Sequence, residues 1–258
     1  MRRLIKGEDA YWKDFSVGNA GDIFAQNLVE LFYGGAKAEN SDTGPRLLCV
    51  GSIAHKAVEG DVICGVGFKE GQNPVADPDK VLVHGVRGPM TEGLLKAKGF
   101  DTSKIKFYGD PGLTISKIVK PVAAKTAKVI FIPHYRERGR VQSLVPQGIE
   151  VVDIDCDPLV LAKQIMEAEL VYASSLHGII FAHALGRPAV PVKPATVEPL
   201  SKYEDYYLGV GLQAPKFLDT IADADFLVAP VSPSSLTVKA DDIVFPSFED
   251  LQQRGIIT

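Results

Sequence analysis

A histidine stands two residues after a pair of serines in the stretch "ASSLHGIIFAHALGR" (173–187), where an apolar strand pattern changes into an apolar helix pattern. We therefore expect His177 at the carboxyl end of a strand and in the first turn of a helix, where free N–H groups and the helix dipole attract anions. Ser174 and Ser175 supply hydroxyl groups and a helix cap. The dipole should lower the pKa of His177, so that this side chain exchanges a proton near neutral pH.

His177 also has a purely structural interpretation, because histidines near helix starts are often hydrogen-bonded packing residues. His183, six residues further and in the middle of the same helix pattern, is expected to be one of these. For His177 alone the sequence leaves function and packing equally open. Other segments must decide between them.

Two further segments place cationic side chains directly after expected strands. "VRGPM" (86–90) puts Arg87 between a strand and a helix, where its guanidinium can bind a carboxylate or phosphate or form a salt bridge to a neighbouring helix. "IPHYRERGR" (132–140) brings His134 and Arg136 closest to a strand end, and the later arginines are expected to be solvated surface charge. Both segments lie on the side of a parallel sheet where ligands bind.

A glycine-rich turn, "VGNAGD" (17–22), comes just before an expected helix. Its glycines let backbone N–H groups approach a ligand closely, and Asp22 can cap the helix. The stretch matches neither the dinucleotide fingerprint nor the P-loop. It is either a plain turn or a ligand contact, with Asn19, Gly21 and Asp22 as the candidates.

The stretch "SKYEDYY" (201–207) gathers Lys202, Asp205 and Tyr206 with two more tyrosines. Aromatic rings with a carboxylate and an amine suit a sugar surface, although a helix packed on its domain would show the same residues. Asp-x-Asp spacings occur at 153–157 and 223–225. The first resembles a strand end followed by a helix cap, so no metal site is expected.

The elements that must position these residues form two α/β series. Strand patterns occur at 46–51, 61–67, 80–86 and 104–112 with helix patterns at 22–34 and 88–99, then strand patterns at 129–133, 148–155, 170–175 and 188–192 with helix patterns at 158–169 and 177–185. Such alternation indicates parallel sheets covered by helices. The stretch 116–128 reads as a linker, which predicts two Rossmann-like domains, 1–118 and 119–258, facing a cleft. The terminal stretch "FPSFEDLQQRGIIT" predicts a helix that packs back on the first domain.

The 258-residue chain has a net charge of −4, which gives no general attraction to nucleic acid or anionic membranes. An anionic ligand must therefore be held by a local cluster of cations. Three widely spaced cysteines, Cys49, Cys64 and Cys156, suit a reducing compartment. The opening residues lack the apolar core of a signal peptide, and no stretch reaches the length of a membrane span. A soluble, cytoplasmic protein is expected.

These segments together resemble one known family. The matching pieces are "GNAGD", "GSI" followed by "CGVGF", "VRGPMT", "GDPGL", "IPHY", "SSLHGIIFAHALGRP" and "KYEDYY". In this order, and from about residue 11 to residue 207, they are similar to the polysaccharide pyruvyltransferases, especially the ketal-pyruvate transferases of bacterial exopolysaccharide synthesis. No single piece is specific, but the ordered set is.

The resemblance implies a GT-B-like glycosyltransferase architecture of two Rossmann-like domains. It implies phosphoenolpyruvate as the donor and two hydroxyls of a saccharide as the acceptor, which can be lipid-linked and so bring the protein to the inner face of the cell membrane. It implies neither a metal nor another cofactor. In the wider family an arginine often stands at the position of Ser175, so Arg87, Arg136 or Lys202 would have to supply that charge here.

The resemblance also implies roles for the candidate residues. His177 would be the general acid or base, Arg87 would bind phosphate or carboxylate, and Asp22 would be a possible base on the acceptor side. The substrate-binding candidates are Asn19, Gly21, His134, Arg136, Ser174, Ser175, Lys202, Asp205 and Tyr206. A nucleotide-sugar glycosyltransferase of the same shape and a non-catalytic glycan-binding relative are the alternatives, since a fold alone does not separate them.

Overall fold

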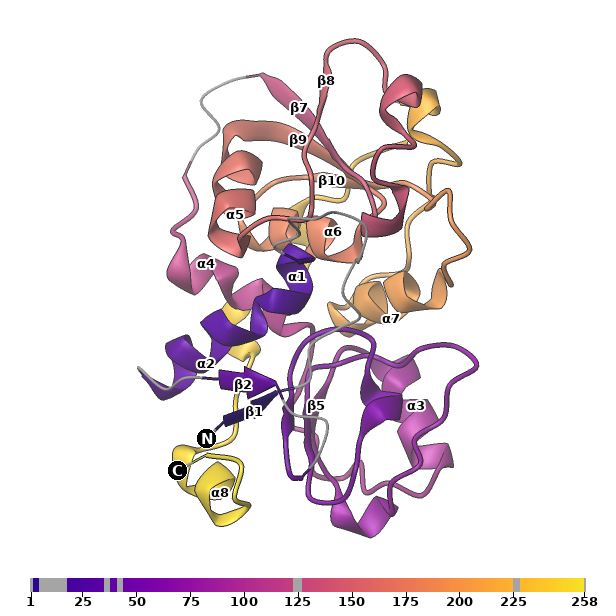
Figure 1. Cartoon of the computed structure of the whole chain (residues 1–258). Coiled ribbons are helices and arrows are strands. Elements are labelled where there is room, and N and C mark those ends of the chain that lie inside the picture. The colour runs from indigo at the N-terminus through magenta and orange to yellow at the C-terminus, as the bar shows by residue number, and fades with distance from the viewer. Residues whose placement is uncertain are drawn as a thin grey trace.

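The computed structural model describes residues 2–4, 18–34, 38–40, 44–122, 127–224 and 228–257. Most of the opening stretch used for the signal-peptide prediction lies outside these residues, as does Asp225 of the second Asp-x-Asp spacing. The chain forms two parallel sheets with helices around and between them (Figure 1). The α/β class predicted from the sequence is confirmed.

The first sheet has strand order β2-β1-β3-β4-β5-β6, and every pair in it is parallel. Its strands are β1 (Arg2–Leu4), β2 (Ala38–Asn40), β3 (Leu47–Leu48), β4 (Val62–Cys64), β5 (Leu82–Val86) and β6 (Phe107–Tyr108). Its helices are α1 (Ala20–Ile23), α2 (Ala25–Tyr33) and α3 (Pro89–Ala97). Each of the four strands predicted between residues 46 and 112 contains an observed one, whereas β1 and β2 were not predicted. The helix predicted at 22–34 is interrupted at Phe24, which separates α1 from α2.

The second sheet has the order β10-β9-β7-β8 and is also parallel throughout. Its strands are β7 (Lys128–Ile132), β8 (Ile149–Val151), β9 (Ala168–Ala173) and β10 (Ala189–Pro191), with helices α5 (Pro158–Glu167) and α6 (Leu176–Ala184). Helix α7 (Ser201–Gly209) follows β10. The stretch predicted as a linker begins as helix α4 (Ile115–Ile118).

One hydrophobic core runs through both sheets. It contains Leu47 and Val62 from the first sheet and Ile130 and Val171 from the second. Helix α6 is apolar on all sides and buried along its length, as expected for a helix enclosed by protein. The rings of Phe24 and Phe181 meet edge to face, with centroids 5.3 Å apart. The division at residue 118 stays a prediction.

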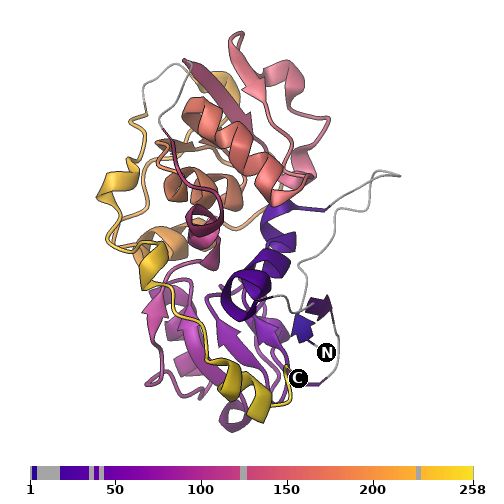
Figure 2. The ribbon, with the colours of Figure 1, turned by 90° about the vertical axis from the view of Figure 1, so that its left-hand side faces the viewer.

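The C-terminal segment returns to the first sheet, where helix α8 (Phe248–Gln253) lies beside it (Figure 2). The ring of Phe245 stacks on Phe32 with centroids 4.1 Å apart. Tyr33 Oη donates to the carbonyl of Pro246 at 2.9 Å. Within the described residues, no helix combines the length and hydrophobicity needed to cross a membrane.

Candidate functional site

A pocket forms where the carboxyl ends of the two sheets face each other. In the second sheet the chain order reverses at β7, so the segments after β7 and β9 flank a topological switch point, which is where open parallel sheets bind ligands. Eight of the twelve predicted site residues line this pocket: Asn19, Asp22, Arg87, His134, Arg136, Ser175, His177 and Lys202. Gly21, Ser174, Asp205 and Tyr206 are not among the residues that line it.

His177 lies in the first turn of α6, which Ser175 caps by accepting from the N–H of Gly178 at 3.4 Å. His177 is buried, with 7% of the residue exposed. Burial first, and then the charges of Arg87 and Lys202, lower the pKa of His177 to about 4, against the opposing effect of Asp22. The predicted direction of the pKa shift is correct, but burial is its main cause. The resulting pKa lies well below neutral pH, whereas the sequence predicted proton exchange near neutral pH. His177 is therefore neutral near pH 7, and its buried Nε2 has no hydrogen-bond partner in the described part of the chain.

Gly21 gives the imidazole of His177 the space that it occupies. A Cβ atom at Gly21 would lie 1.9 Å from both Cγ and Nδ1 of His177. The ring thus rests on the backbone of α1. Gly21 was predicted to contact substrate; the structure shows that it supports a pocket residue instead.

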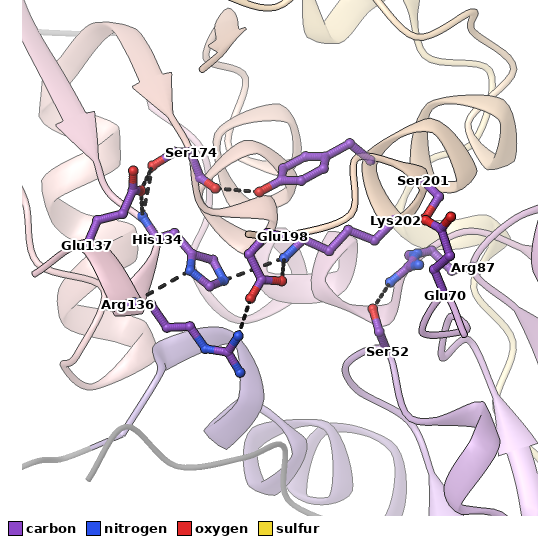
Figure 3. A network of polar contacts seen from close by, with 11 residues as sticks. Ser52, Glu70, Arg87, His134, Arg136, Glu137, Ser174, Glu198, Ser201 and Lys202 are labelled. Atoms are coloured by element: carbon purple, nitrogen blue, oxygen red, sulfur yellow. Dashed lines mark hydrogen bonds and ion pairs between the residues drawn. The ribbon is translucent and has the colours of Figure 1, made fainter. Parts of the chain in front are cut away.

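Arg87 follows β5 and is almost fully buried, at 1% exposure. Its Nε donates to Asp205 Oδ2 at 3.2 Å. Its Nη1 donates to Ser52 Oγ at 2.9 Å (Figure 3). Nη2 has no partner among the residues that the structure describes. A Cβ atom at Gly67, in the "CGVGF" piece, would lie 2.0 Å from Arg87 Cζ. The site therefore presents one buried guanidinium nitrogen that is ready to donate.

Asp205 does not reach the pocket, contrary to the prediction that it contacts a sugar. Besides Arg87, its carboxylate accepts from the backbone N–H groups of Met90 and Thr91, both at 3.0 Å, and from Thr91 Oγ1 at 2.7 Å. A residue of α7 thus caps α3 and holds Arg87. The close approach needs two glycines, because a Cβ at Gly88 would lie 1.8 Å from the Asp205 carbonyl oxygen. The second is Gly209, where a Cβ would lie 1.9 Å from the carbonyl oxygen of Arg87.

Tyr206 is likewise buried away from the pocket. Its hydroxyl lies 2.9 Å from His183 Nδ1. The prediction that Tyr206 binds sugar is not supported by this geometry, because helix α7 turns that side chain into the core. His183 is the packing residue that the sequence predicted.

Lys202, in the first turn of α7, belongs to a cluster of charges at the pocket wall (Figure 3). Glu198 joins Lys202 Nζ at 3.0 Å and Arg136 Nη1 at 2.6 Å. Lys202 Nζ also lies 3.5 Å from His134 Nε2. Burial, with the charges of Lys202 and Arg136, lowers the pKa of His134 to about 2, so this ring is neutral too.

The backbone behind His134 is held by a buried glutamate. Glu137 Oε2 accepts from the N–H of His134 at 2.9 Å and from the hydroxyl of Ser174, and Glu137 Oε1 accepts from the N–H of Ala195 at 2.6 Å. Ser174 Oγ also accepts from the N–H of His134 at 2.9 Å. Ser174 was predicted to bind substrate, but its hydroxyl joins the segments after β7 and β9, and Glu137 extends this link to the segment after β10.

Residues 18–20 contact the segment that follows β8. Asn19 Oδ1 accepts from the N–H of Gly21 at 3.0 Å and so caps α1. The N–H of Gly18 donates to Asp155 Oδ1 at 2.9 Å, and that of Ala20 donates to the carbonyl of Ile154 at 2.8 Å. Asn19 and Asp22 therefore line the pocket from the cap and first turn of α1, which are fixed to the segment after β8.

Arg138 corrects the expectation of solvated surface charge. Its side chain is 7% exposed and pairs with Asp153 at 2.6 Å and with Asp155. The carboxylates of the first Asp-x-Asp spacing are thus occupied by a cation of the protein. Over the described residues, no group of three or more His, Cys, Asp or Glu side chains is placed to hold a metal ion.

Sequence reasoning missed Ser52, Glu137 and Glu198. Ser52 belongs to the "GSI" piece after β3, so its position after a strand was a usable signal. Glu137 stands three residues after His134, the spacing of a capping box, and the structure forms that box. Glu198 lies four residues before Lys202, but it precedes the helix, so helix spacing did not reveal it.

Comparison with known proteins gives one family. The family described as "Polysaccharide pyruvyl transferase" matches residues 31–195, a range that contains Arg87, His134 and His177 but neither the "GNAGD" turn nor Lys202. "Uncharacterized protein L143" of Acanthamoeba polyphaga mimivirus is 36% identical over 188 residues, 68% of this chain and 64% of that protein. "Succinoglycan biosynthesis protein ExoV" of Rhizobium meliloti is 26% identical over 213 residues, 78% of this chain and 64% of that protein. The match thus spans just under two thirds of either relative, and no solved structure matches.

Proposed function

The chain belongs to the polysaccharide pyruvyl transferase family, and we propose that it transfers the pyruvyl group of phosphoenolpyruvate to two hydroxyls of a saccharide. The products would be a cyclic pyruvate ketal and inorganic phosphate. The relative named for succinoglycan biosynthesis supports an exopolysaccharide or its precursor as the acceptor. We also propose the GT-B-like arrangement, which the two parallel sheets with facing carboxyl ends support. The cytoplasmic location, the lipid-linked acceptor and the lack of a cofactor stay predictions.

The observation that carries this proposal is a pair of buried nitrogens in one pocket. Arg87 Nη2 and His177 Nε2 both lack a hydrogen-bond partner within the described residues. Buried polar atoms are almost always paired, so two such atoms at the carboxyl ends of two sheets indicate a ligand that accepts from or donates to them. An anion with several oxygens, such as phosphoenolpyruvate, fits this need.

In this proposal some pocket groups bind the anion and others transfer or orient protons. Arg87 Nη2 and the first-turn N–H groups of α6 would hold the phosphate or carboxylate, replacing the arginine that the wider family carries at Ser175. His177 is neutral, so its Nε2 can accept the proton of an attacking hydroxyl. Asp22 lies on α1 at the same pocket, where its carboxylate can orient that hydroxyl.

Ligand-dependent thermal unfolding tests the donor. Phosphoenolpyruvate at about 100 times its dissociation constant should stabilise the fold by roughly 2.7 kcal/mol, which raises Tm by several degrees. Arg87→Ala should abolish that shift. A shift with a nucleotide sugar and none with phosphoenolpyruvate would favour the glycosyltransferase alternative. Binding of phosphoenolpyruvate without phosphate release would favour a non-catalytic relative.

Turnover is then measured with simple acceptors. The protein, phosphoenolpyruvate and methyl glucoside, galactoside or mannoside should release phosphate and form a glycoside heavier by one pyruvyl ketal. His177→Ala should bind phosphoenolpyruvate and lose turnover by about 10²–10⁴-fold, the usual contribution of general acid–base catalysis. Near-normal turnover in both His177→Ala and Arg87→Ala would contradict the assignment.

A further inference from the structure

Lys202 has its ammonium group held inside the pocket rather than in solvent. Nζ donates to Glu198 Oε2 at 3.0 Å, lies 3.5 Å from His134 Nε2 and stands 5.2 Å from the centre of the Tyr203 ring. The side chain is 14% exposed, and Figure 3 shows it extending from α7 towards His134 and Glu198. A flexible side chain is thus fixed in one direction, with its charged end at the pocket wall.

The proposed reaction needs a proton donor that the residues assigned so far do not supply. His177 and His134 have pKa values lowered to about 4 and about 2, chiefly by burial, so both rings are neutral near pH 7. A neutral imidazole accepts a proton far more readily than it gives one. An arginine guanidinium is a poor proton donor in proteins, so Arg87 is not suited to this step. Carbon protonation therefore requires another group.

Lys202 has the protonation properties that this donor needs. Burial lowers its pKa from the ordinary value, and the hydrogen bond and charge of Glu198 oppose part of that lowering. A lysine whose pKa is lowered gives up its proton more easily than lysine in water. The charged or titratable groups that face it, from the other elements around the pocket, are Asp22, Arg87, His134, His177 and Glu198. Tyr135 also lines the pocket, but burial raises its pKa and makes it a weaker acid.

We propose, building on the pyruvyl transfer proposed above, that Lys202 is the general acid of the reaction and that Glu198 positions it. The Nζ–H bond breaks, and the proton bonds to C3 of phosphoenolpyruvate through the electron pair of the C2–C3 double bond. The first hydroxyl adds to C2 and gives its proton to His177 Nε2. The bond from C2 to the phosphate oxygen breaks with its electron pair on phosphate, which takes the proton from His177. The second hydroxyl adds to C2, and its proton returns to Lys202.

The decisive variant is Lys202→Arg, because it keeps the positive charge and removes the transferable proton. It should bind phosphoenolpyruvate nearly as well as the wild-type protein, measured by thermal stabilisation, and lose turnover by at least about 100-fold on the methyl hexopyranoside that the wild type uses. Lys202→Ala should recover part of its turnover when methylamine is added. Turnover of Lys202→Arg within a few-fold of wild type would show that Lys202 supplies charge alone and would overturn the inference.

The pH profile gives an independent test through Glu198. Lys202 must be protonated to act, so kcat/KM should fall as pH rises through its pKa. Glu198→Gln removes a charge that raises this pKa and should move the basic limb of the profile to lower pH. An unmoved limb would also overturn the inference. If phosphoenolpyruvate does not stabilise even the wild-type protein, the proposed function fails, and this inference fails with it.

Discussion

Replacing Asp205 with asparagine should leave Arg87 charged and without its partner in the interior. The two side chains are 0% and 1% exposed, and Asp205 Oδ2 accepts from Arg87 Nε at 3.2 Å. An asparagine can still accept the backbone N–H groups of Met90 and Thr91 through Oδ1, as Asp205 does at 3.0 Å. Its Nδ2 would then face Arg87 Nε, so an acceptor becomes a donor opposite another donor.

The size of the effect follows from this burial. Removing one partner of a buried ion pair costs about 3–5 kcal/mol, because an uncompensated charge stays inside. Since domains are stable by about 5–15 kcal/mol, the Asp205→Asn variant should still fold but unfold at clearly lower urea. Thr91→Val is the matched control. It removes a hydrogen bond to the same carboxylate and the acceptor of the Phe68 N–H, for about 1–3 kcal/mol, and keeps the ion pair.

A double-mutant cycle measured by urea unfolding separates the ion pair from general damage. Arg87→Met carries no charge, so adding Asp205→Asn to it should cost at least about 1.5 kcal/mol less than adding it to the wild type. The Asp205→Asn variant should also lose stabilisation by phosphoenolpyruvate. If the losses in unfolding free energy of the two single variants add to within about 0.5 kcal/mol in the double variant, the two side chains do not depend on each other, and the reasoning is refuted.

The remaining predictions concern His177 and pH. Gly21→Ala would put a methyl group 1.9 Å from the imidazole of His177 and should reduce turnover. The control Gly93→Ala, where the added Cβ meets nothing within 4 Å, should leave turnover unchanged and stabilise α3 by up to about 1 kcal/mol. Equal turnover in the two variants would contradict the packing argument. Three buried histidines have lowered pKa values: His134, His177 and His183. Their unfolded forms bind protons below about pH 6.5 while the folded forms do not, so urea unfolding should show stability falling from pH 6.5 towards pH 4. Asp110, whose pKa is raised to about 6 by burial, offsets one of them below pH 6, and a flat profile would exclude the lowered values.

The sequence located the pocket residues that follow strands. Arg87, His134 and His177 each follow a strand whose apolar pattern is clear, and the carboxyl ends of parallel strands share one edge of a sheet. Local pattern and a general property of sheets were therefore enough to bring these residues to the ligand side. This prediction did not require knowledge of how the two sheets pack against each other.

The sequence did not reveal which polar side chains bind other side chains of the protein instead of lining the pocket. Asp205 and Tyr206 are neighbours of Lys202 in one polar and aromatic stretch, yet only Lys202 reaches the pocket. The difference depends on how α7 packs against Arg87 and Gly88, a contact between segments more than a hundred residues apart. Arg138 was missed for the same reason, since its partners become neighbours only when β8 pairs with β7.

Residues 245–257 affect when the first sheet can complete its packing during synthesis. Phe245 covers Phe32, and Leu251, Ile256 and Ile257 belong to the same core as Leu28 of α2. A nascent chain leaves the ribosome from its N-terminus at about 5–20 residues per second, and complete domains usually fold as they emerge. Here the first sheet emerges early but lacks part of its apolar covering until residues 245–257 follow. The native packing around the first sheet is therefore completed only after residues 245–257 have been synthesised.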